Sequence, residues 1–172
     1  MKKYLITPEP SYMQLRKYMP DFALFRNKED EHYAQHAAEF VEMYKQFQNM
    51  NCFLHQDYEL AHKLGADGVH LTSQQFDAIP LAKDLGLEVV ISTHTHDEVH
   101  IAEAMGADYI TYGPVFETPN KGEPKGVDDL REIIAMTDIK VFALGGIISD
   151  EQVKALEESG AYGFASIRYF RA

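Results

Sequence analysis

One segment of the sequence gathers polar side chains in the way that ligand-binding loops do. The run Tyr109–Tyr112 predicts a strand, and it ends at a Gly-Pro pair. The next segment, VFETPNKGEPKG, places Thr118, Asn120 and Lys121 among prolines and glycines. Long polar loops that leave a strand end often carry functional residues. We therefore interpret 113–126 as a candidate ligand-binding loop, and an ordinary exposed connection is the alternative.

A glycine pair, Gly145-Gly146, marks a second candidate site after the apolar run Val141–Leu144. Glycines at a strand end let backbone N–H groups approach an anion closely, particularly where a helix follows. Ile167 and Arg168 end the last apolar run, and a guanidinium can add a charge-assisted hydrogen bond to a phosphate. Gly145, Gly146, Ile167 and Arg168 together predict a phosphate-binding site.

The elements that would position these residues form a repeating strand–helix pattern. Helical spacing is found in Glu31–Gln48, His96–Met105, Val127–Ala135 and Asp150–Glu158, with Thr95 and Ser149 as expected N-caps. Eight apolar runs predict strands: Lys3–Thr7, Phe22–Arg26, Cys52–His55, Gly68–Leu71, Glu88–Thr93, Tyr109–Tyr112, Lys140–Leu144 and Gly163–Ile167. This alternation predicts an α/β protein, a compact (β/α)8 TIM barrel forming one domain over 1–172.

A short internal repeat supports the barrel. Gly65-Ala66-Asp67-Gly68, Gly106-Ala107-Asp108-Tyr109 and Gly160-Ala161-Tyr162-Gly163 precede the fourth, sixth and eighth runs. Each begins with a glycine where a helix should end in a left-handed cap. An open doubly wound sheet is the alternative, but no GxGxxG follows the first run.

The length of 172 residues is small for this fold, in which about 250 residues are usual. The crossover over 8–20 is short and the sequence stops soon after the eighth run. We therefore expect a barrel that lacks a full final helix. A homodimer could cover the flank left open between the first and eighth strands.

Composition restricts the kind of partner. A net charge of −11 argues against nucleic acid, because binding to a phosphate backbone needs a basic face. The single cysteine, Cys52, lies in an apolar run and fits a reducing compartment, and no segment has the roughly 18 apolar residues that a membrane span needs. We expect a cytoplasmic protein with a small-molecule partner.

Several segments resemble the thiamine phosphate synthase/TenI family. The resemblance rests on IST-HT, GADYITYGPVFETPNKG, VFALGGI and GAYGFASI, with weaker likeness through YLIT, LFRNK, FLHQDYELA and GADGVHL. It covers nearly the whole chain in order and implies a TIM barrel, in agreement with the strand count.

The resemblance also implies roles for individual residues. Synthases of this family join a pyrimidine pyrophosphate to a thiazole phosphate with Mg²⁺ and release pyrophosphate. Gly146, Ile167 and Arg168 match the thiazole-phosphate site, where Arg168 replaces the usual serine. Positions that face pyrophosphate and substrate are matched by Arg26, Lys28, Ser92, Thr118, Asn120 and Lys121, with Asn120 in place of the usual threonine.

Other positions depart from the synthase pattern. His55-Gln56 stands where synthases have Asn-Asp, and Gln75 stands where they have a second aspartate. Leu24 replaces the glutamine that reads the pyrimidine. Neutral amides are poor ligands for Mg²⁺, so we expect no cofactor, and Mg²⁺ only if synthase activity is retained. We also expect no metal site at the histidines that follow strands, since no carboxylate accompanies them.

These observations favour a TenI-like protein that binds a thiazole phosphate or a similar phosphorylated heterocycle. Catalysis would be proton transfer, as in the tautomerases of the TenI branch. Their catalytic histidine is replaced here by Pro114, so another base is needed. His94 is the first candidate, before His55 and His70, and Lys121 would supply a cation. The alternatives are a degenerate thiamine phosphate synthase, a non-catalytic binder or regulator, and an isomerase of a sugar or indole phosphate.

Overall fold

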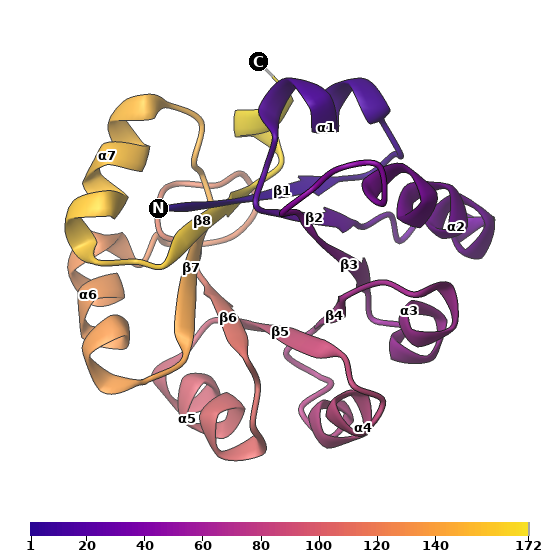
Figure 1. Cartoon of the computed structure of the whole chain (residues 1–172). Coiled ribbons are helices and arrows are strands. Elements are labelled where there is room, and N and C mark those ends of the chain that lie inside the picture. Colours follow the sequence, from indigo (N-terminus) through magenta and orange to yellow (C-terminus); the bar gives the residue numbers. More distant parts are fainter. Residues whose placement is uncertain (172) are drawn as a thin grey trace.

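The structure is a computed structural model that describes residues 1–171. Eight parallel strands close into a barrel in sequence order, each paired with its neighbours and β1 with β8. The strands are β1 (Lys2–Thr7), β2 (Phe22–Phe25), β3 (Asn51–His55), β4 (Gly68–Leu71), β5 (Glu88–Thr93), β6 (Tyr109–Tyr112), β7 (Lys140–Leu144) and β8 (Gly163–Ser166). Figure 1 looks into this barrel, with the helices around its outside. The predicted TIM barrel is confirmed.

Seven α-helices connect successive strands. They are α1 (Tyr12–Tyr18), α2 (Tyr33–Tyr44), α3 (Tyr58–Leu64), α4 (Ala78–Asp84), α5 (His96–Met105), α6 (Gly126–Met136) and α7 (Asp150–Ser159). The helices α1, α3 and α4 were not predicted from the sequence, because seven residues make only about two turns and show little periodicity. Thr95 and Ser149 are N-caps as predicted, each accepting a backbone N–H with its side chain. No helix within the described residues is long and apolar enough to cross a membrane.

Within the described residues, a short 3-10 helix, η1 (Arg168–Arg171), follows β8 in place of an α-helix. Figure 1 shows it beside α1. Phe170 is buried against Phe164 and Tyr18, and its carbonyl accepts a hydrogen bond from Gln14. The chain therefore covers part of the flank between β1 and β8 by itself, and the homodimer stays a prediction.

The glycine-containing repeat that precedes β4, β6 and β8 ends the helix before each of these strands. Gly65, Gly106 and Gly160 end their helices in the left-handed conformation, as predicted. The aspartate of the repeat accepts a hydrogen bond from a backbone N–H of the preceding odd strand, Asp67 from Cys52 at 2.7 Å and Asp108 from Val89 at 2.8 Å. These hydrogen bonds link β3 to β4 and β5 to β6 at the N-terminal end of the barrel.

Aromatic rings fill the N-terminal half of the barrel interior and form what we call the aromatic plug: Tyr4, Phe22, Phe53, Tyr109, Phe142 and Tyr162. Neighbouring rings lie with centroids 5.1–6.5 Å apart, within the range of favourable aromatic contacts. Glycines make room for the plug. A Cβ atom on Gly68 would lie 2.5 Å from the Phe53 ring and 2.3 Å from the Glu88 carbonyl oxygen.

This packing predicts that Gly68→Ala is strongly destabilising. The added methyl group meets a ring and a backbone oxygen that cannot move, so we expect a loss of about 3 kcal/mol in the free energy of unfolding. Gly106→Ala is the matched control, because its Cβ would meet open space and only its φ of +91° opposes the substitution, at about 1 kcal/mol. Urea denaturation measures both, and equal losses would contradict the account of the plug.

Candidate functional site

A cavity of about 810 Å³ opens above the plug, at the carboxyl ends of the strands. Its apolar floor includes Ile6, Leu24 and Ala165. Ten of the eleven residues predicted for the site line it, and they are Arg26, Lys28, Ser92, His94, Thr118, Lys121, Gly145, Gly146, Ile167 and Arg168. The eleventh, Asn120, lies exposed on the loop after β6 and is not among the lining residues. These ten residues come from five different strand ends and the loops after them, and they meet around one space.

The charge of the cavity has a single sign. Arg26, Lys28, Lys121 and Arg168 line it, whereas no aspartate or glutamate of residues 1–171 does. The chain as a whole carries a net charge of −11. A concave surface lined by one sign of charge concentrates ligands of the opposite sign. The cavity is therefore suited to an anion.

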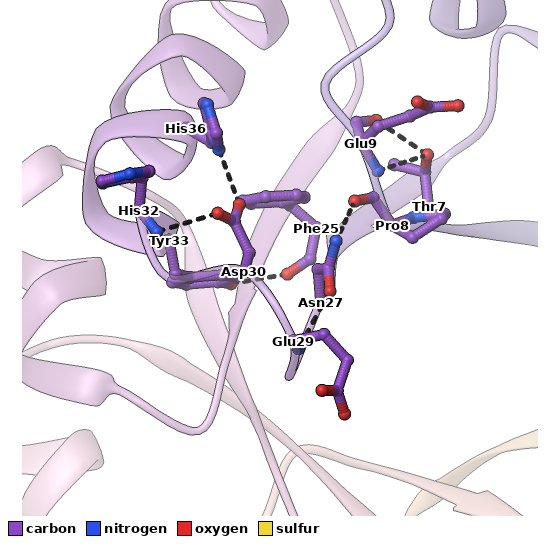
Figure 2. A network of polar contacts seen from close by, with 10 residues as sticks. All are labelled: Thr7, Pro8, Glu9, Phe25, Asn27, Glu29, Asp30, His32, Tyr33 and His36. Carbon is purple, nitrogen blue, oxygen red and sulfur yellow. Dashed lines mark hydrogen bonds and ion pairs between the residues drawn. The ribbon is translucent and has the colours of Figure 1, made fainter.

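The loop between β2 and α2, which carries Arg26 and Lys28, is held by a network of side-chain contacts (Figure 2). Asn27 donates its side-chain N–H to the Pro8 carbonyl at 2.9 Å and accepts from the Glu29 N–H at 3.0 Å. Asp30 closes the loop onto α2, where its carboxylate lies 2.6 Å from His36 Nδ1. This contact lowers the pKa of Asp30 and raises that of His36.

Tyr33 connects this loop to the next strand. Its ring stacks on Phe25 at a centroid distance of 4.7 Å, and its hydroxyl donates to the Phe25 carbonyl at 2.6 Å. The same hydroxyl accepts the N–H of His55 at 3.0 Å. The strand ends that present Arg26 and His55 to the cavity are thereby held at a fixed separation.

The loop after β6 is docked against the turn after β7 through glycines. The Val115 N–H donates to the Leu144 carbonyl at 2.9 Å, and the Phe116 N–H donates to the Gly145 carbonyl at 3.0 Å. A Cβ on Gly146 would lie 2.4 Å from the Glu117 carbonyl oxygen. Gly146 therefore permits close packing of the two backbones, which is a second reason for a glycine here besides the predicted approach of an anion.

Two of the three candidate histidines are held neutral. Burial lowers the pKa of His70 to about 3, with further contributions from His55 and Arg26. Burial, together with Arg26 and Lys28, lowers the pKa of His55 to about 3. His94 lies at the rim with half of its side chain exposed, and its Nδ1 is 3.5 Å from the Glu98 carboxylate. The fixed positive charge of the cavity thus comes from lysine and arginine.

The fold and this cavity define a TIM barrel with a cationic cavity at the carboxyl ends of the strands, where the ligand sites of this fold lie. The sequence profile described as TMP-TENI, thiamine monophosphate synthase, matches residues 5–170. The chain belongs to the thiamine monophosphate synthase family.

Individual relatives agree with this assignment. "Putative thiamine-phosphate synthase 2" of Aquifex aeolicus is 35% identical over 120 residues, which cover 68% of this chain and 64% of that protein. "Thiamine-phosphate synthase" of Bacillus licheniformis is 38% identical over 128 residues, covering 72% and 56%. The matches thus span about three fifths of these relatives. A solved thiamine phosphate pyrophosphorylase from Pyrococcus furiosus has the same fold, with a TM-score of 0.84 at 24% identity, covering 99% of this chain and 91% of that one.

The residues of the cavity do not fit the Mg²⁺ that the resemblance to synthases implies. Gln75 uses its amide oxygen to accept the Thr72 N–H at 3.0 Å and its amide nitrogen to donate to the Gln56 carbonyl at 3.3 Å. Asp57, the nearest carboxylate in sequence to Gln56, caps α3 by accepting the Leu60 N–H at 2.9 Å. Mg²⁺ prefers carboxylate oxygens, and none lines the cavity in the described part of the chain.

Three residues that were not predicted for the site, Thr72, Ser73 and Gln74 in the turn after β4, also line the cavity. Tyr4 was not predicted either, although its hydroxyl lies 2.6 Å from His70 Nδ1 beneath the cavity. A tyrosine in an apolar run carries no signal of its partner, because the partner lies 66 residues away.

The two neutral histidines predict a loss of stability in acid. The unfolded chain protonates histidine near pH 6.5, whereas the folded protein does so only near pH 3, so the free energy of unfolding falls as the pH drops between these values. Each histidine adds a slope of about 1.4 kcal/mol per pH unit. His55→Gln should reduce the slope between pH 5.5 and 4 by that amount in denaturation experiments, and the exposed His100→Gln should not. An unchanged slope in His55→Gln would contradict the neutral state of His55.

Proposed function

We propose that the protein binds a thiazole phosphate, or a similar phosphorylated heterocycle, in this cavity without a divalent cation. The observation that carries the proposal is the lining of two lysines and two arginines with no carboxylate among the described residues. A phosphate dianion matches this charge. A magnesium–pyrophosphate pair would need carboxylate ligands that the cavity does not supply.

The phosphate would lie at the carboxyl ends of β7 and β8. Gly145, Gly146 and Ile167 line the cavity there, and Arg168 adds a guanidinium that can pair with phosphate oxygens. The ring would then extend across the cavity towards Ser92 on β5, with Arg26 and Lys28 beside it. Thr118 and Lys121 would contact it from the loop after β6, the segment interpreted from the sequence as a ligand-binding loop.

Catalysis, in this proposal, is proton transfer on the bound heterocycle. His94 can act as the base, because the Glu98 carboxylate beside Nδ1 favours a proton there and leaves Nε2 as the acceptor. Lys121 would stabilise the negative charge that develops when a proton is removed. His55 is the second candidate. Its imidazole lines the cavity, although its low pKa of about 3 makes it a weaker base.

A thiamine-phosphate synthase is the second candidate function, and the names of the Aquifex and Bacillus relatives favour it. Incubation with pyrimidine pyrophosphate, thiazole phosphate and Mg²⁺, followed by mass spectrometry, separates the two. Thiamine phosphate formed at a rate proportional to protein concentration would support the synthase and contradict a magnesium-free role. Its absence would favour the first proposal.

Binding should be independent of Mg²⁺ and dependent on Arg168. We expect calorimetry to give the same affinity for thiazole phosphate, within about twofold, in Mg²⁺ and in EDTA. Arg168→Gln should weaken binding by about tenfold or more, because a charge-assisted hydrogen bond contributes about 1.5–3 kcal/mol. Arg131→Gln is the control, since Arg131 lies exposed on α6 and pairs with Asp128. Binding seen only with Mg²⁺ would refute the proposal.

The assignment of the base predicts that His94→Gln separates turnover from binding. The rate of thiazole-phosphate aromatisation, followed by ultraviolet absorbance, should fall by about 100-fold or more, as expected when a general base is lost. Affinity should change by less than about threefold. If His94→Gln retains the rate and His55→Gln loses it, His55 is the base. No rate above background in the unchanged protein, together with tight binding, would assign a binder without catalysis.

A further inference from the structure

A buried chain of three polar side chains runs from the aromatic plug to the cavity. The Tyr4 hydroxyl lies 2.6 Å from Nδ1 of His70, and Nε2 of His70 lies 2.9 Å from Oγ of Ser92. Tyr4 is 0% exposed and His70 is 3% exposed, whereas Ser92 lines the cavity. The function proposed above makes no use of Tyr4 or His70.

The surroundings of Tyr4 decide which atoms donate in this chain. Its ring packs against Phe22, Phe53 and Phe142, with centroids 5.1–5.9 Å away. Within residues 1–171, His70 is the one hydrogen-bond partner of the Tyr4 hydroxyl. A buried O–H without an acceptor costs about 1–3 kcal/mol, so the hydroxyl must donate to Nδ1.

The direction of the Tyr4–His70 hydrogen bond determines the direction of the His70–Ser92 hydrogen bond. When Nδ1 accepts, a neutral imidazole carries its proton on Nε2 and donates it to Ser92 Oγ. Burial keeps His70 neutral, with a pKa of about 3, so this order holds across the physiological range of pH. The hydroxyl hydrogen of Ser92 cannot then point at His70 and is available to whatever occupies the cavity.

We propose that Tyr4 and His70 are positioning residues that make Ser92 a hydrogen-bond donor to the heterocyclic part of the ligand. The site would thereby select a ring that presents an unprotonated acceptor at that point, such as a ring nitrogen or a ring-borne carboxylate. This inference rests on the proposed function, which places the phosphate at the ends of β7 and β8, away from Ser92.

The direct test of the proton order needs no ligand and no variant of Tyr4. In spectra of protein labelled with ¹⁵N-histidine, His70 should show a protonated Nε2 and an unprotonated Nδ1. His70→Gln identifies its signals by their disappearance. A proton on Nδ1 would overturn the inference, whatever the protein binds.

The functional test is a double-mutant cycle with two probes, thiazole phosphate and inorganic phosphate. Tyr4→Phe keeps the ring but loses the hydroxyl, and it should weaken thiazole-phosphate binding by about fivefold, the value of one typical hydrogen bond. Ser92→Ala should weaken it by at least as much, and adding Tyr4→Phe to Ser92→Ala should have no further effect. Inorganic phosphate should bind all variants equally.

The control substitution is Tyr44→Phe, on α2 and outside the cavity, which should leave both affinities unchanged. An equal effect of Tyr4→Phe with and without Ser92, or an equal loss of affinity for inorganic phosphate, would show a merely structural role and overturn the proposal. If thiazole phosphate binds no variant at all, the proposed function fails, and the histidine spectra still decide the order of the chain.

Discussion

The aromatic plug is the constraint on which the other features depend. Six rings fill the N-terminal half of the barrel, and Gly68 and Gly163 make room for Phe53 and Phe142 by having no side chains. A parallel barrel of eight strands normally fills its interior with side chains. Here the filling is concentrated at one end. The carboxyl ends of the strands are left with polar residues around an open space of about 810 Å³.

The charge of the lining side chains determines which ligands the cavity can bind. Four cationic side chains line the cavity, although the net charge of the chain is −11. Carboxylates have structural roles elsewhere: Asp57 caps a helix, and Asp67 and Asp108 accept hydrogen bonds from neighbouring strands. The two buried histidines remain neutral, because burial and the neighbouring cations oppose a further positive charge. The cavity therefore combines fixed positive charge with neutral hydrogen-bonding groups, a combination suited to a phosphate attached to a polar ring.

Much of the fold could be predicted from the sequence, because its signals are local. The strand Glu88–Thr93 and the helix His96–Met105 have their predicted bounds, since a β-branched run and the Thr95 cap each act within a few residues. The Gly-Ala-Asp repeat also has the predicted helix-ending glycines. The two-turn helices were not assigned, because they are too short to show a period.

The site was harder to predict, because its contacts are non-local. Strand ends in a barrel converge, and that rule alone brings Arg26, Ser92 and Arg168 together. The rule does not predict that the Gly146 backbone packs against Glu117 or that the Tyr4 hydroxyl contacts His70. It also does not predict that the amide oxygen and nitrogen of Gln75 are both hydrogen-bonded to backbone groups of neighbouring turns. Those facts depend on the register and packing of segments far apart in the chain.

A crystal structure of the protein grown with thiazole phosphate in the presence of EDTA tests the central claim most directly. The account predicts a phosphate group between the backbone of Gly145-Gly146 and the guanidinium of Arg168, with the ring directed towards Ser92 and no metal ion bound to it. An empty cavity under these conditions, with the ligand appearing only when Mg²⁺ is supplied, would contradict it.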